Sequence, residues 1–308
     1  MKALREAFGD ELLLLGKEYP NLYVIDADIG KSCKTVDFQN EFPSQHVNVG
    51  IAEQNAAGVA AGLATLKKIP IVSTYAIFGS LRMIEQIRQE ACYPNLNVKL
   101  MCSHGGLTPA NDGASHQGIE DMGVYRTIPN MTVIAPADYH AARTLIRKAV
   151  EMYGPVYMRF TRDPIPYTYA EGVELEIGKA NLISEGSDIG LIANGDIMPF
   201  AVKAAKELEK EGISVRLLDM HTIKPLDTAS VIETIEKCNA IITLEDHNII
   251  NGLGSAVAEV IAEYGKGKLK RMGVQDRFGE SGPYEELLKI NGFTVENIVS
   301  NAKKLIGK

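Results

Sequence analysis

The pattern of hydrophobic and polar residues divides the chain into short apolar runs that alternate with longer amphipathic segments. The short runs are rich in β-branched residues, as strands are, and the longer segments have helical spacing. In the first half the predicted strands are residues 22–26, 46–49, 69–75, 98–103 and 132–136. Because continuous apolar strands alternate with helices, we expect a parallel sheet covered on both faces, with ligand-binding residues in the loops after the carboxyl ends of the strands.

The alternation stops near residue 160 and resumes near residue 188. The stretch between them, RDPIPYTYAEGVELEIG, is rich in Pro, Tyr and Gly, as a domain linker is. A chain of 308 residues is also longer than the chains that usually fold around a single hydrophobic core. We therefore expect an α/β protein with two doubly wound domains, residues 1–170 and a smaller domain of residues 171–308.

Charge and cysteine content exclude several classes of function. A net charge of −7 argues against a general nucleic-acid binder. The four cysteines form no CxxC pair and no cluster with metal spacing, so we expect reduced thiols and no metal bound by this chain. No segment approaches the roughly 20 apolar residues of a membrane span, and the N-terminus lacks a cleavage site. We therefore expect no membrane association and a cytoplasmic location.

One carboxylate lies in a helix built almost wholly of Ala and Gly. The segment NVGIAEQNAAGVAAGLATL predicts a strand that ends near Gly50 and runs directly into this helix, with Glu53 in its first turn. Glu53 can be a simple helix-start acid, which the helix dipole favours. It can also be a buried functional carboxylate, since an otherwise apolar helix offers it little water.

Two further segments carry candidate chemistry. STYAIFGSLRMIEQIRQE places Tyr75 and Phe78 three positions apart where a strand gives way to a helix, although such aromatics are more often core residues than ligand contacts. The long loop SHGGLTPANDGASHQGIEDM contains His104, Asp112 and His116. Long unpatterned loops in compact domains are usually functional, and this spacing fits no common zinc motif. A glycine-rich surface loop with solvated histidines remains the alternative.

These segments together resemble the C-terminal half of a transketolase, a member of the thiamine diphosphate-dependent enzymes. The resemblance implies a pyrimidine-binding domain followed by a C-terminal transketolase domain. It also implies that Glu53 hydrogen-bonds the pyrimidine ring nitrogen of the cofactor and that Tyr75 and Phe78 pack on that ring. A further aromatic residue of some members falls on Leu81, so that contact is absent here. Asp28 matches an aspartate near the cofactor and the subunit interface.

The same resemblance implies a substrate channel. His104 would help to hold the sugar phosphate, Asp112 would bind a substrate hydroxyl, and His116 would contact oxygens near the reacting carbonyl. Both histidines would also assist proton movement. Three more positions fall on ligands of the substrate phosphate: Arg5, Ser32 and Arg162. Arginine suits this role because its guanidinium group can bind phosphate oxygens in a bidentate manner.

The other half of a transketolase site is missing from this sequence. We find no GDG motif with a following Asn, which the family uses to bind a divalent ion such as Mg²⁺ and the cofactor diphosphate. The resemblance therefore implies an N-terminal partner subunit that holds both, with this chain as a homodimer within a heterotetramer. Because the chain opens on Met1 with a helix at once, we expect a natural start.

The implied reaction is transfer of a two-carbon glycolaldehyde unit from a ketose phosphate to an aldose phosphate, as in pentose phosphate metabolism. The alternatives are the beta subunit of a two-oxo-acid decarboxylase or dehydrogenase, and a split deoxyxylulose phosphate synthase. A non-catalytic subunit that retains the fold is a third alternative. The histidine loop and the phosphate ligands favour a sugar phosphate, and Glu53 argues against a non-catalytic role.

One glycine-rich motif should not be taken as a nucleotide site. NGLGSA follows a predicted strand and resembles the start of a dinucleotide fingerprint, but its third glycine position is Val257. We therefore expect a tight turn there.

Overall fold

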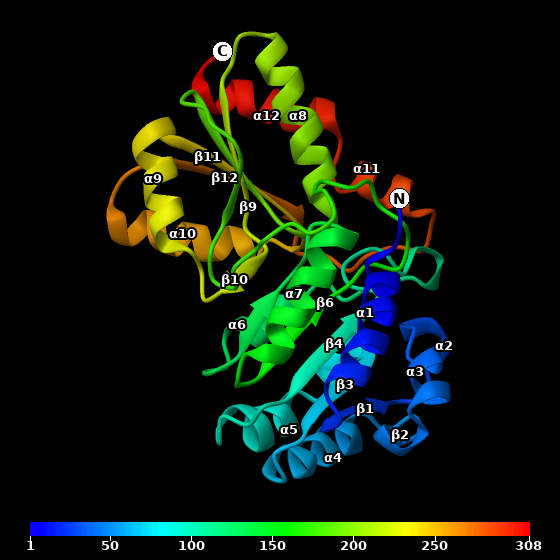
Figure 1. Ribbon diagram of the computed structural model, residues 1–308. Coiled ribbons are helices and arrows are strands. Elements are labelled where there is room, and N and C mark those ends of the chain that lie inside the picture. The colour runs from blue at the N-terminus through cyan, green and yellow to red at the C-terminus, as the bar shows by residue number, and fades with distance from the viewer.

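The computed structural model describes residues 1–308 as two α/β units, one above the other in Figure 1. The N-terminal unit contains a sheet in the order β10-β5-β6-β4-β3-β1-β2, and the C-terminal unit a sheet in the order β12-β11-β8-β9-β7. The expected fold class, two doubly wound domains of the transketolase type, is confirmed. No helix has both the length and the apolar character that crossing a membrane would require.

The N-terminal unit follows the predicted βα order. Its strands are β1 (Leu22–Asp26), β2 (His46–Asn48), β3 (Ile69–Tyr75), β4 (Lys99–Ser103), β5 (Thr132–Ile134) and β6 (Val156–Arg159). Its helices are α1 (Leu4–Glu18), α2 (Gly30–Cys33), α3 (Val36–Glu41), α4 (Glu53–Thr65), α5 (Ile84–Gln86), α6 (Asp121–Arg126) and α7 (Tyr139–Glu151). The strands β1 to β6 pair in parallel, so their carboxyl ends meet along one edge.

Helices cover both faces of this sheet because each face is apolar. Phe8 and Leu12 of α1 and Leu145 of α7 share one buried cluster with alternate residues of the strands. On the other face, Ala56 and Ala60 of α4 pack on the sheet. The small side chains of α4 allow it to lie close to the sheet.

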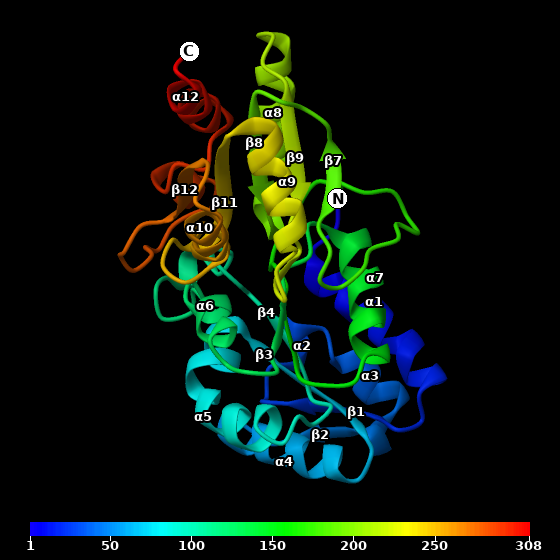
Figure 2. The same cartoon turned by 90° about the vertical axis from the view of Figure 1, so that its left-hand side faces the viewer.

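The C-terminal unit has the same layered construction. Its strands are β7 (Asn181–Ser184), β8 (Ile189–Ala193), β9 (Val215–Asp219), β10 (Thr222–Lys224), β11 (Ala240–Asn248) and β12 (Lys268–Val274). Its helices are α8 (Met198–Lys210), α9 (Thr228–Cys238), α10 (Leu253–Tyr264), α11 (Tyr284–Ile290) and α12 (Val295–Ile306). In Figures 1 and 2 this unit lies above the carboxyl-terminal part of the first, and α10 lies beside α6, where Arg126 pairs with Glu259.

Two strands depart from the expected parallel arrangement. β7 pairs antiparallel with β9, and β10 leaves its own unit to pair antiparallel with β5 at the edge of the first sheet. Only Met220 and His221 separate β9 from β10, and a parallel crossover needs a dozen or more residues, so β10 cannot return beside β9 in parallel. Its three residues carry no periodic pattern from which this pairing could be predicted.

The linker contains no helix or strand between β6 and β7, and our boundary at residue 170 stays a prediction. Asp138, the N-cap of α7, holds part of the linker in place. This carboxylate accepts hydrogen bonds from the backbone nitrogens of Ala141, Thr168 and Tyr169. The linker is therefore attached to the first unit.

A buried ionic network holds the two units together. The Arg159 guanidinium at the end of β6 lies 3.2 Å from Asp121 Oδ1 and donates to the backbone oxygens of Gly118 and Asp246. Asp246 in turn accepts from the backbone nitrogen of Leu107. Burial, reinforced by the neighbouring Asp196 carboxylate, raises the pKa of Asp246 well above its usual range.

We predict that Arg159→Met lowers the free energy of unfolding by about 3–5 kcal/mol, because it leaves the buried Asp121 carboxylate without its cation. Urea unfolding followed by circular dichroism measures this change. Arg88→Met, which changes an exposed arginine, is the matched control and should stay within about 0.5 kcal/mol of the native chain. Equal midpoints for the two variants would contradict the stabilising role of the network.

Candidate functional site

The predicted site residues lie in the loops that follow the parallel strands of the N-terminal sheet. All but Arg5, which lies on α1, come after a strand of that sheet or at its end. They are Asp28 and Ser32 after β1, Glu53 after β2, Tyr75 and Phe78 at the end of β3, His104, Asp112 and His116 after β4, and Arg162 after β6. This is the edge at which doubly wound sheets bind ligands.

Four rings form the centre of this group. The Tyr75 ring stacks on the His104 ring with 3.9 Å between centroids, and it lies 5.7 Å from Phe78. The His116 ring meets Phe78 edge-on at 5.4 Å. Tyr75, Phe78 and His116 are half-buried, so the cluster is open on one side. The structure therefore brings together the aromatic pair and both histidines.

His104 is held in one orientation by buried neighbours. Its Nδ1 lies 2.8 Å from Ser103 Oγ, which lies 3.3 Å from the Cys33 thiol. Burial, followed by the charges of Arg5 and Arg162, lowers the pKa of His104 to about 3. Its imidazole is therefore neutral at physiological pH, with one nitrogen able to donate and the other able to accept. Burial also raises the pKa of Cys33 to about 12, so its sulfur stays protonated.

Two arginines lie close enough to His104 for their charges to act on it. Arg5 Nη1 donates to the backbone oxygen of Ser32 at 3.1 Å, and its buried Nε has no hydrogen-bond partner in the protein. Arg162 Nη1 donates to a backbone oxygen at 3.1 Å and lies 3.6 Å from Asp112 Oδ2. A buried donor without an acceptor is costly, so this end of the site suits an anion.

Glu53 begins α4 and is only 6% exposed, which favours a buried carboxylate over a solvated helix-start acid. Its Oε1 lies 2.9 Å from Nη1 of Arg82, a residue that the sequence analysis did not select. The Arg82 guanidinium also lies over the Phe78 ring, 3.8 Å from its centroid. The sequence did offer one sign of its contact with Phe78. Arg82 lies four residues after Phe78, and residues four apart are neighbours on a helix surface.

Asp28 forms its side-chain hydrogen bond with a residue outside the predicted set. Its side chain is exposed and accepts a hydrogen bond from Asn48 at 3.0 Å, and no hydrogen bond joins it to the other predicted residues. Its backbone adopts a positive φ of 65°. It therefore shapes the loop after β1, and its part in cofactor binding stays a prediction.

The NGLGSA turn is closed by a protein carboxylate. The buried Glu245 side chain accepts hydrogen bonds from the backbone nitrogens of Leu253 and Gly254, the first residues of α10. A dinucleotide phosphate would need those same nitrogens. The structure therefore supports our expectation of a turn. No group of three or more His, Cys, Asp or Glu side chains is arranged to hold a metal ion.

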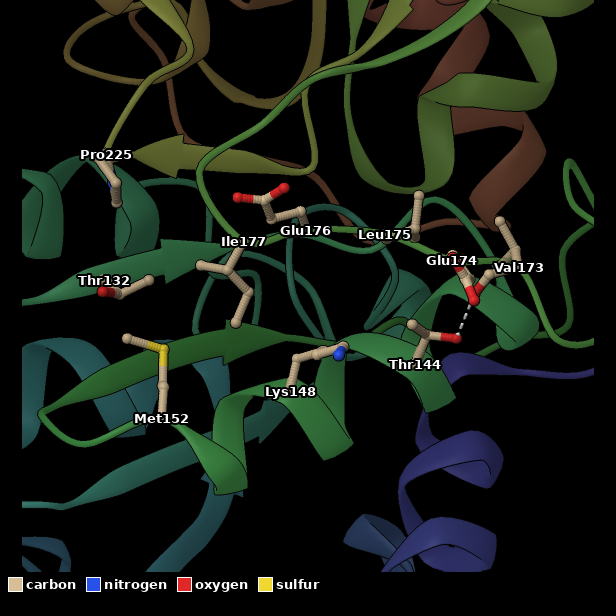
Figure 3. A pocket seen from close by; sticks show the side chains of 10 residues that line it. All are labelled: Thr132, Thr144, Lys148, Met152, Val173, Glu174, Leu175, Glu176, Ile177 and Pro225. Atoms are coloured by element: carbon tan, nitrogen blue, oxygen red, sulfur yellow. Dashed lines mark hydrogen bonds between the residues drawn. The ribbon is translucent and has the colours of Figure 1, made fainter.

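A pocket of about 1050 Å³ lies elsewhere, and its lining includes none of the predicted site residues. Figure 3 shows the linker residues 173–177 crossing above α7, with Thr144 and Lys148 of that helix and Met152, directly after its end, below them. The pocket lies beside a linker and lacks the converging histidines and arginines of the strand edge. We therefore place the candidate site at the edge of the sheet.

Comparison with protein families agrees with this architecture. The family described as "Transketolase, pyrimidine binding domain" matches residues 1–167, and "Transketolase, C-terminal domain" matches residues 178–298. A Methanocaldococcus jannaschii protein named as a transketolase C-terminal section is 46% identical over 96% of this chain and 94% of its own length. The 6-deoxy-6-sulfo-D-fructose transketolase subunit of Clostridium sp. is 36% identical over 98% of this chain and 94% of that protein.

Solved structures give the same result. A structure described as "Split gene transketolase, inactive beta4 tetramer" is 44% identical, covers 100% of this chain and 99% of its own, and superposes with a TM-score of 0.93. Campylobacter jejuni transketolase, 23% identical with a TM-score of 0.82, covers 100% of this chain and 47% of its own, and shows the shared fold alone. The resemblance to the C-terminal half of a split transketolase is confirmed. The chain belongs to the transketolase family, whose pyrimidine-binding and C-terminal domains it carries.

Proposed function

We propose that this chain is the C-terminal subunit of a thiamine diphosphate-dependent transketolase that moves a two-carbon glycolaldehyde unit from a ketose phosphate to an aldose phosphate. The observation that carries the proposal is that three kinds of group gather in one place. A buried carboxylate, a cluster of rings and two arginines all lie where the parallel strands of one sheet end. A cytoplasmic location and a role in pentose phosphate metabolism are part of this proposal.

The carboxylate end suits the pyrimidine ring of the cofactor. Glu53 can hydrogen-bond a ring nitrogen, and Phe78 and Tyr75 offer faces on which a flat ring can pack. The fit is supported by Arg82, since its planar, nitrogen-bearing guanidinium already makes both kinds of contact. When bound, thiamine diphosphate supplies the carbon–carbon bond chemistry, and the protein supplies orientation and proton exchange.

The arginine end suits the phosphate of a sugar. The unpaired Arg5 Nε and the half-buried Arg162 provide charged donors, and the charges of both act on neutral His104, whose ring stacks on Tyr75. His116, in edge contact with Phe78, is placed near the reacting carbonyl in this proposal. Asp112, 3.6 Å from Arg162, would bind a hydroxyl of the sugar.

The relatives indicate how far the sugar can vary. Their names include a sulfo-fructose transketolase subunit, and an apulose-4-phosphate transketolase subunit of Phocaeicola vulgatus that is 34% identical over 100% of this chain. Sulfonate and phosphate are both tetrahedral anions, and two arginines can bind either one. The principal alternative is a deoxyxylulose phosphate synthase, since the Desulfotalea psychrophila enzyme is 36% identical and this chain covers 47% of it.

We propose that an N-terminal subunit binds Mg²⁺ and the cofactor diphosphate, and that two copies of each chain form a heterotetramer. Two large apolar residues support an interface beside the site: Ile51, just before Glu53, is 77% exposed, and Leu81, just before Arg82, is 47% exposed. Apolar side chains gathered at a surface are typical of a contact with another chain. The inactive tetramer of a related split transketolase supports the requirement for a partner.

We expect ketol transfer only when this chain is mixed with the N-terminal subunit, thiamine diphosphate and Mg²⁺. Glu53→Gln should then lower kcat by about 10²–10⁴-fold, because it removes the group that exchanges a proton with the pyrimidine. A coupled assay with xylulose and ribose phosphates measures the dependence on the N-terminal subunit and the loss of kcat. Glu263→Gln, on the exposed surface of α10, is the control. Decarboxylation of a two-oxo acid by the mixture, without ketol transfer, would favour the decarboxylase alternative.

Arg162→Met should lower kcat/KM for ribose 5-phosphate by about 10–100-fold, the effect of losing a charged hydrogen bond of about 1.5–3 kcal/mol. The value for unphosphorylated ribose should change little, because that acceptor lacks the anion. Steady-state kinetics of the variant with ribose 5-phosphate and with ribose measure the two values of kcat/KM. Equal losses for the two acceptors would place the phosphate elsewhere.

His104 should remain neutral from pH 5 to 9, because its pKa is lowered to about 3. The unfolded chain binds this proton near pH 6.5, so this group reduces the stability of the folded chain progressively as pH falls from 6.5 to about 3. NMR titration of ¹⁵N-labelled histidines, with His104→Gln to assign the signal, measures it. A midpoint near 6.5 would contradict the buried, arginine-flanked position.

A further inference from the structure

Arg82 makes both of its side-chain contacts inside the candidate pyrimidine site. Its Nη1 donates to Glu53 Oε1 at 2.9 Å, and its Cζ lies 3.8 Å from the centroid of Phe78. No other hydrogen bond or ion pair holds its side chain. The guanidinium thus places a flat face on an aromatic ring and an N–H on a buried carboxylate at the same time.

These are the two contacts that an aminopyrimidine ring would need from the same residues. A hydrogen bond from a ring nitrogen or its proton to Glu53 uses the carboxylate, and packing on Phe78 uses the ring face. Two planar groups cannot occupy one face of one ring together. We propose that Arg82 is an internal occupant of the pyrimidine site, which it must leave when thiamine diphosphate binds. This inference rests on the proposed function.

The surroundings of Arg82 permit this movement. Its side chain is 49% exposed, so solvent can receive the released guanidinium, and half-exposed ion pairs are weak. Glu53, by contrast, has a side chain that is only 7% exposed. Without Arg82 and without a cofactor, its carboxylate would be buried with no partner, which is unfavourable. Arg82 therefore stabilises the free subunit and competes with the cofactor.

The two roles predict effects of opposite sign for one substitution. Arg82→Met removes the competitor, so the cofactor should bind more tightly. The same change leaves Glu53 without its partner, so the free chain should unfold at a lower temperature. A purely structural arginine would produce only the second effect. An arginine that supports the bound cofactor would weaken binding.

The test is calorimetric titration of thiamine diphosphate, with Mg²⁺ present, into this chain copurified with its N-terminal subunit. The expected result for Arg82→Met is a Kd about 3–10-fold lower, because the apparent Kd rises as the fraction of open sites falls. Arg88→Met is the matched control: it removes an exposed arginine of the same segment whose side chain forms no hydrogen bond or ion pair, and the Kd should not change.

Arg82→Lys provides a second measurement should the methionine variant fold poorly. Lysine keeps the positive charge but lacks the flat face, so its Kd should lie between those of Arg82→Met and the native enzyme. An unchanged or higher Kd for both Arg82 variants would overturn the inference while leaving the proposed function intact. Failure of the native two-subunit enzyme to bind thiamine diphosphate would instead overturn the proposed function, and this inference with it.

Discussion

The position of the histidine loop depends on one buried cation, Arg159. Its guanidinium is surrounded by Asp121 and by the backbone oxygens of Gly118 and Asp246, so it joins β6, the end of the loop, and β11 of the other unit. The loop starts beside it: a Cβ at Gly105 would lie 2.1 Å from the Arg159 side chain. Close approach to this cation therefore requires glycine directly after His104.

The C-terminal unit completes the support of that loop, although it contributes none of the predicted site residues. Asp246 receives the backbone nitrogen of Leu107, and a Cβ at Gly106, where φ is +60°, would lie 2.1 Å from the Asp246 carboxylate. Near the other end of the loop, Gln117 donates to the backbone oxygen of Glu280 at 2.9 Å. The second unit thus acts as a scaffold, and the site is formed by loops held from both sides.

The site has opposite charges at its two ends, and each charge is handled differently. At the arginine end, Arg5 retains a buried donor that protein atoms do not satisfy, and His104 is kept neutral by burial and by the flanking cations. At the carboxylate end, Glu53 is already paired by Arg82. The arginine end thus has a free donor for an anion, whereas the carboxylate at the other end already has a cation from the same chain.

The sequence alone determined much of the order of strands and helices, because β-branched runs such as residues 69–75 and the Ala-Gly helix after Gly50 have strong local patterns. It also placed the candidate residues after strands, since a parallel sheet brings those loops to one edge. Only the tertiary structure decided which side chains meet. The pairing of Arg82 with Glu53, the transfer of β10 to the first sheet and the hydrogen bond from Asn48 to Asp28 leave no local signal. Each depends on contacts between segments brought together by folding, and local periodicity carries no information about those contacts.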